Sequence, residues 1–155
     1  MSDPQGWLER YGQSHQNLAY PLVFWPGLLI VVLGTVGLLW ALPIPSAFYD
    51  ISPFLNWGSV FLMATTVYYF IISLPIAIGM LPFVVALAAF QLWLGTLDLP
   101  AADISLALLA AGVAGLWIGH RNKPGIMPVV VDLQLMMIGP AWLLSALYRR
   151  LNIPF

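Results

Sequence analysis

Long apolar runs separated by short polar segments dominate this sequence. Four of these runs predict membrane-spanning helices, because each approaches the ~20 apolar residues needed to cross a ~30 Å hydrocarbon layer. Their expected bounds, in chain order, are 20–42, 54–73, 76–97 and 104–119. Prolines, glycines and charged residues fill the segments between them, where such residues end helices.

The N-terminal residues 1–19 are mostly polar. We expect a short interfacial helix over 4–16, which Asp3-Pro4 can start. Trp7 and Tyr11 would be its anchors at the lipid headgroups. No basic stretch followed by an apolar core opens the chain, so the first apolar run is expected to stay in the mature protein.

The last apolar stretch, 129–148, has two interpretations. It is long enough for a fifth span, but it contains Asp132 and is followed by Arg149 and Arg150. The alternative is a re-entrant or interfacial segment, in the form of a helical hairpin broken near Gly139-Pro140.

Charge supports the second interpretation. With four spans, Arg10, Arg121, Lys123, Arg149 and Arg150 all fall on one side of the membrane. A fifth span would move the last two of them to the other side, against the tendency of basic residues to gather in the cytoplasm. We therefore predict an all-α polytopic membrane protein, a single domain over 1–155, with four transmembrane helices, a re-entrant or interfacial C-terminal segment and both termini in the cytoplasm.

Composition agrees with a membrane protein. The chain is 61% hydrophobic and only 7% charged, against about 25% charged in ordinary soluble domains. Its net charge of −1 offers no basic surface for nucleic acid. The absence of cysteine excludes disulfides, thiolate metal sites and cysteine nucleophiles.

The fourth run also contains a group of small residues, which permit close helix packing. We expect them to form a packing face rather than a functional site. They are Ala110, Ala111, Gly112, Ala114 and Gly115.

The two histidines of the chain suggest a metal site. His15 precedes the first span, and His120 follows the fourth, so an even number of crossings returns both to one membrane face. Asp132 lies on the same side in this topology. Imidazole and carboxylate together bind divalent iron, zinc or copper. Exposed interfacial histidines without a ligand role are the plain alternative.

Three parts of the chain resemble a known family. They are YGQSHQN (11–17), SLPIAIGML (73–81), and a C-terminal part with WIGHRNKP and DLQLMMIGPAWLLSALYRRL. They are similar to the bacterial branch of the small membrane proteins that include the fungal endoplasmic-reticulum 2-hydroxy fatty acid dioxygenase. The resemblance implies Fe²⁺ held by histidines, 2-hydroxy fatty acids and dioxygen as substrates, and removal of one carbon. It also implies a bacterial inner-membrane location.

The family motifs map onto this chain only in part. Tyr11, His15 and Asn17 match an N-terminal Tyr-x-x-x-His motif and the asparagine after it. His120 matches a later Gly-His motif, and Asp132 also matches. Phe24 stands where the family has a second histidine, which removes one implied ligand.

A second departure is Lys123, which occupies a position where an acidic residue is common in the family. Arg121 and Lys123 could pair with a fatty acid carboxylate, although basic residues at this place also serve topology alone. Tyr11 and Asn17 are further candidates for substrate contact, and Glu9 is a second candidate carboxylate ligand.

Two functions follow from the sequence. One is an iron-dependent oxygenase with His15, His120 and Asp132 as the metal ligands. The other is a non-catalytic membrane protein that keeps the fold and binds lipid. A transporter is a weaker third interpretation, because no ionisable residue lies within a span except Asp132 in the ambiguous last stretch. A homo-oligomer is left open.

Overall fold

The computed structural model describes residues 4–155, so Asp3 lies outside the described residues. Within them the chain forms helices and no strand, as the sequence predicts. In chain order the helices are α1 (Pro4–Ser14), α2 (Pro21–Ala41), α3 (Ser46–Ile51), α4 (Trp57–Ile72), α5 (Leu74–Leu94), α6 (Ala101–Gly119), α7 (Met127–Gln134) and α8 (Ile138–Arg150).

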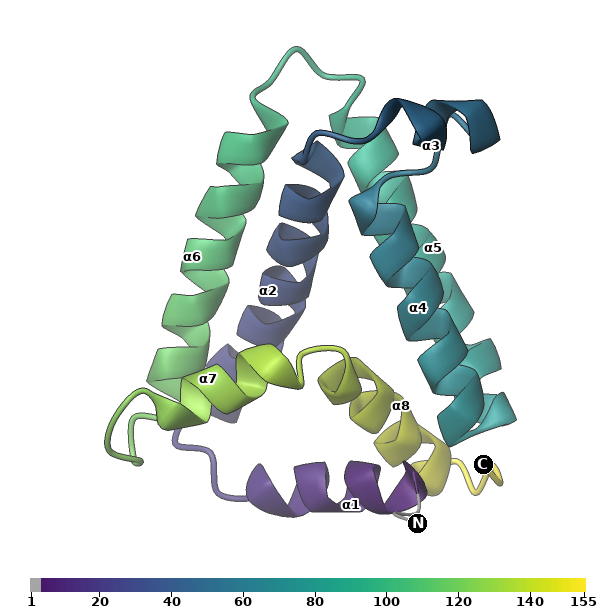
Figure 1. Cartoon of the computed structure of the whole chain (residues 1–155). Coiled ribbons are helices and arrows are strands. Elements are labelled where there is room, and N and C mark those ends of the chain that lie inside the picture. Colours follow the sequence, from purple (N-terminus) through teal and green to yellow (C-terminus); the bar gives the residue numbers. More distant parts are fainter. Residues whose placement is uncertain (1–3) are drawn as a thin grey trace.

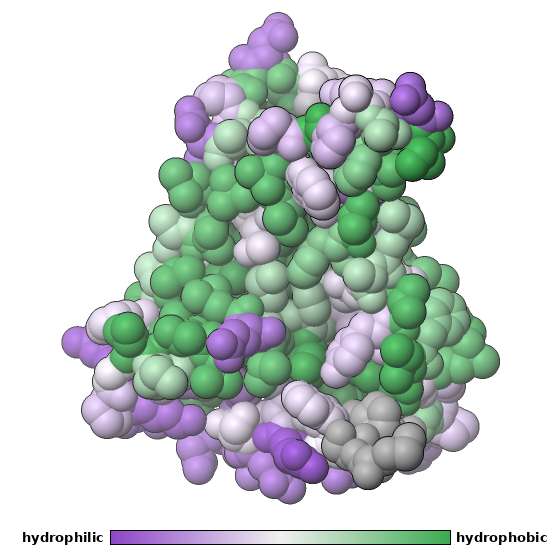
Figure 2. Space-filling model, viewed as in Figure 1, coloured by the Kyte–Doolittle hydropathy of each residue, from purple (hydrophilic) through white to green (hydrophobic). Residues whose placement is uncertain are grey.

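Helices α2, α4, α5 and α6 run between the two ends of the molecule (Figure 1). Of these, α2, α5 and α6 are long and apolar enough to cross a membrane, with 21, 21 and 19 residues. Helix α4 is apolar but has only 16 residues, about 24 Å at the helical rise. Figure 2 shows a mostly apolar middle zone with hydrophilic residues concentrated at both ends, as expected for an integral membrane protein.

The boundary between α4 and α5 differs from the expected one. The sequence places the second span at 54–73 and the third at 76–97, but Ser73 alone separates the two helices, in an extended conformation. Pro75 lies in the first turn of α5, where its missing N–H costs no hydrogen bond, and Gly79 lies inside that helix. The segment between α2 and α4 contains α3, a short exposed helix, where the sequence predicted no helix.

Helices α2 and α6 pack closely through glycines. A Cβ atom at Gly34 would lie 2.6 Å from the backbone nitrogen of Leu109 and 2.8 Å from the carbonyl oxygen of Ser105. Gly112 and Gly115 of the predicted packing face are buried against α2. The alanines of that face are exposed, so the expectation is correct only for the glycines.

Three helices, α1, α7 and α8, lie across one end of the bundle (Figure 1). The α7–α8 pair would be long and apolar enough for one span, but its two halves are bent by 77°. This bend agrees with the predicted re-entrant or interfacial segment and not with a straight fifth span. The break falls at 135–137 instead of at Gly139-Pro140, because Pro140 is in the first turn of α8, where proline is tolerated.

Candidate metal centre

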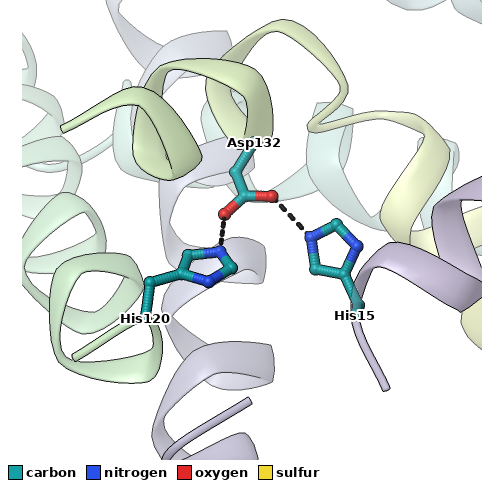
Figure 3. Close-up of side chains that lie close together, drawn as sticks. All are labelled: His15, His120 and Asp132. Atoms are coloured by element: carbon teal, nitrogen blue, oxygen red, sulfur yellow. Dashed lines mark hydrogen bonds and ion pairs between the residues drawn. The ribbon is translucent and has the colours of Figure 1, made fainter. Parts of the chain in front are cut away.

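His15, His120 and Asp132 meet at the end of the bundle where α1, α7 and α8 lie, although they come from three separate parts of the chain (Figure 3). His15 follows α1, His120 is the C-cap residue of α6, and Asp132 belongs to α7. All three are buried, and Asp132 is only 1% exposed. The predicted convergence of the two histidines with this carboxylate is therefore confirmed.

The carboxylate of Asp132 bridges the two imidazoles. Its Oδ1 lies 2.6 Å from His15 Nε2, and its Oδ2 accepts a hydrogen bond from His120 Nε2. Each oxygen thus contacts one ring, and the two rings lie on either side of the carboxylate (Figure 3) with their planes tilted by 58°. A buried charge of this kind requires such partners, because an unpaired carboxylate in an apolar setting is strongly disfavoured.

The end of α1 orients His15. The Nδ1–H of His15 donates to the carbonyl oxygen of Tyr11 at 2.8 Å, while the Tyr11 ring stacks on the imidazole with centroids 4.0 Å apart. Ser14 Oγ lies 2.7 Å from the same nitrogen. Because the ring hydrogen is held on Nδ1, Nε2 of the neutral ring presents a lone pair to Asp132. A cation, either a proton or a metal ion, is needed between these two acceptors.

Contacts between two loops hold His120 near His15. The backbone N–H of Ala19 donates to the carbonyl of Gly119 at 3.0 Å. The side-chain amide of Asn122 donates to the carbonyl of Asn17 at 2.8 Å. The ammonium of Lys123 donates to the carbonyl of Ser14 at 3.2 Å. The segment after α6 is therefore fastened to the segment after α1, which brings their histidines together.

The donor set is compatible with a metal ion. One ligand atom from each of His15, His120 and Asp132 lies within 4.8 Å of the others. A single ion with bonds of about 2.0–2.1 Å to imidazole needs them within about 4 Å, so the side chains must move slightly closer to bind one ion. His120 Nδ1 is also buried with no partner among the described residues. If the His120 ring only contacted Asp132, its buried Nδ1 would have no partner, and this would reduce the stability of the fold.

Aromatic side chains wall the centre. The Phe24 ring has its centroid 5.3 Å from that of His15 and 5.2 Å from that of His120. Trp25 lies beside His15 at 6.2 Å. Burial, followed by the negative charge of Asp132, raises the pKa of the Tyr11 hydroxyl, so this phenol stays protonated. This side of the centre is therefore apolar.

The other predicted residues occupy varied positions. Arg121 and Lys123 line a small cavity together with His120. Tyr11 is buried against His15, so it does not serve as the predicted headgroup anchor. The Asn17 side chain is exposed, and the structure uses its backbone carbonyl. Glu9 is exposed and lies outside the cluster of metal-binding side chains.

Sequence reasoning missed the residues that support the centre. They are Ser14 and Asn122, which fix the loops that carry the histidines. Polar residues in short loops are common, so no pattern distinguishes these two. Phe24, which stands at the position of a histidine in the motif of the resembled family, lies beside both histidines.

Comparisons of this chain with models of protein families, with curated proteins and with solved structures found no match.

Proposed function

We propose that this protein is an iron(II)-dependent membrane oxygenase that acts on 2-hydroxy fatty acids with dioxygen as the second substrate. The observation that carries the proposal is the buried cluster of His15, His120 and Asp132. Two histidines and one carboxylate are the ligand set by which many non-haem iron oxygenases hold the metal and leave positions open. The substrate class comes from the resemblance of the sequence to the 2-hydroxy fatty acid dioxygenase family.

In this proposal, bound iron supplies the chemistry of dioxygen, and the chain supplies binding and orientation. His15 offers its Nε2 atom, His120 offers one of its ring nitrogens, and Asp132 offers a carboxylate oxygen. The carbonyl of Tyr11 fixes the tautomer of His15 by accepting its Nδ1–H, a role typical of groups behind metal-bound histidines. The aromatic wall of Tyr11, Phe24 and Trp25 excludes water from the centre.

The position at one end of the apolar zone suits a lipid substrate. A fatty acid keeps its carboxylate at the level of the headgroups and its chain in the hydrocarbon layer. The candidate centre lies where α6 ends and its apolar sequence gives way to a polar loop (Figure 1). The reacting end of the substrate would therefore reach the centre without leaving the membrane.

A second candidate is the non-catalytic lipid-binding protein of the same fold. Phe24 favours it, because this side chain cannot bind a metal and it fills the space beside both histidines. The close contacts of the Asp132 carboxylate with both rings also fit a purely structural role for the cluster.

Anaerobic titration with ferrous iron in a mild detergent distinguishes the two candidates. We expect about one iron per chain in the parent protein, and loss of binding in His15→Gln and in His120→Gln. Asp103→Asn, an exposed residue in the first turn of α6, is the matched control and should bind iron as the parent does.

The loaded protein is then given oxygen and 2-hydroxyhexadecanoic acid. Oxygen uptake that depends on the acid, with a product shorter by one carbon, supports the proposal. Iron binding without uptake contradicts the oxygenase and leaves a metal-binding lipid protein. A parent protein that takes up no iron favours the non-catalytic candidate.

A further inference from the structure

A small cavity lies beside the candidate metal centre. Its volume is about 220 Å³. Its lining comes from the end of α6, the following loop and α7, and consists of Trp117, His120, Arg121, Lys123, Gly125 and Val129. His120 belongs both to this cavity and to the cluster with Asp132. One imidazole therefore forms the boundary between the two.

The charge of the cavity is entirely positive. Arg121 and Lys123 contribute two cations, and no acidic residue is part of the lining. Lys123 spends one N–H donor on the carbonyl of Ser14, which leaves two of its three. Arg121 is exposed at the cavity. Guanidinium and ammonium groups form their strongest hydrogen bonds with anions such as carboxylates.

The lining also has an apolar part, formed by Trp117 of α6 and Val129 of α7. Trp117 is on the last turns of α6 and is 54% exposed, and its neighbour Ile118 is 41% exposed. Tryptophan at such a level is typical of the boundary between hydrocarbon and headgroups. The cavity thus has a cationic side at the loop and an apolar side along α6.

We propose that this cavity binds the carboxylate end of an amphiphile whose chain stays in the bilayer. Arg121 and Lys123 hold the carboxylate, and Trp117 and Val129 contact the first carbons of the chain. The volume is below the ~300 Å³ at which pockets for whole drug-sized ligands begin, so it suits a head group and not an entire acyl chain. As a consequence, the carboxyl end of the molecule, and not its methyl end, lies next to His120.

The inference rests on the proposed function for the identity of this amphiphile as the substrate, but its test needs no metal and no turnover. Metal-free protein, prepared with a chelator in a neutral detergent at pH 8, is titrated with tritiated 2-hydroxyhexadecanoic acid and with its uncharged methyl ester. Binding is corrected for partition into protein-free micelles.

We expect the parent protein to bind the acid about tenfold more tightly than the ester, as a charge-assisted contact provides. Arg121→Gln combined with Lys123→Gln should remove that preference and leave the affinity for the ester unchanged. Arg121→Gln alone should weaken acid binding as well, and it leaves the Lys123 contact with Ser14 in place. Arg150→Gln, which removes an exposed cation of α8 outside the cavity, is the control and should keep the full preference.

Equal binding of acid and ester by the parent overturns the inference, as does an equal loss in Arg150→Gln, which would indicate only the general attraction of a basic surface. These results are independent of the metal. A protein that prefers the acid but takes up no iron keeps this cavity as a lipid-carboxylate site and loses the oxygenase. A protein that binds iron and consumes oxygen without the preference keeps the oxygenase and loses this site.

Discussion

The ring of Phe24 meets the imidazole of His120 edge-on, with ring centroids 5.2 Å apart and an angle of 73° between the planes. The same ring is 5.3 Å from His15, and Phe24 is fully buried. A side chain at this position of α2 therefore reaches both candidate ligands. The phenyl ring of Phe24 thus occupies the position from which a third ligand nitrogen could bind a metal ion.

Replacement of Phe24 by histidine should strengthen metal binding. The new imidazole would start from a position in contact with both histidines, so we expect the affinity for ferrous iron to rise about tenfold or more. The metal-free variant should lose about 1–3 kcal/mol of stability, because a polar ring replaces an apolar one in a buried place. Iron titration and thermal unfolding with and without metal measure the two effects.

Val31→His is the matched control for this change. Val31 is also fully buried on α2, but it lies seven residues further along, about 10 Å away at the helical rise. It should lose stability without gaining iron affinity. An equal affinity gain in both variants, or none in Phe24→His, would show that position 24 does not face the metal.

Asp132→Asn tests the carboxylate. The amide keeps the size of the side chain but removes the charge that both imidazoles share. We expect iron affinity to fall about 10–100-fold, the usual scale for loss of a group that binds or orients at a metal site. Asp50→Asn, exposed on α3, should change nothing. Unchanged iron binding in Asp132→Asn would remove this residue from the ligand set.

The meeting of His15 and His120 could be predicted from the sequence because it depends on the number of membrane crossings between them. Each apolar run of membrane length reverses the side on which the chain emerges, so four crossings return it to the starting face. Asp132 follows His120 by only 12 positions and shares that face. These relations require only the hydrophobic pattern and the distribution of basic residues.

Other features depend on contacts that no pattern reveals. The bend after α7 falls at 135–137, where the hydroxyl of Tyr69 donates to the carbonyl of Met137 at 2.6 Å. Tyr69 belongs to α4, which is distant in the sequence. The local pattern of residues, which favoured a break at Gly139-Pro140, could not reveal this hydrogen bond. The backbone hydrogen bond of His15 and the unmatched Nδ1 of His120 likewise arise only once the helices have packed.

Gly34→Ala should destabilise the bundle. The added methyl group would lie well inside contact distance of the α6 backbone at Leu109 and Ser105, so α2 and α6 must separate. We expect a loss of about 1–3 kcal/mol, measured by thermal unfolding in detergent. Gly95→Ala is the control, because its nearest neighbours would be at 3.4 and 3.5 Å, an ordinary contact, and its φ of −67° suits alanine.

The last prediction concerns the side of the membrane on which the candidate centre lies. Helices α1 and α8 occupy the same end as the centre, and α3 occupies the opposite end (Figure 1). The end with the candidate centre carries all five basic residues, so we predict from the positive-inside tendency that it faces the cytoplasm. The chain has no cysteine, so Arg150→Cys and Asp50→Cys each create a unique label site, one at either end. A thiol reagent that cannot cross membranes should label position 50 in intact cells and position 150 only after lysis. Labelling of position 150 from outside would place the centre and its cationic cavity on the outer face and would contradict the predicted topology.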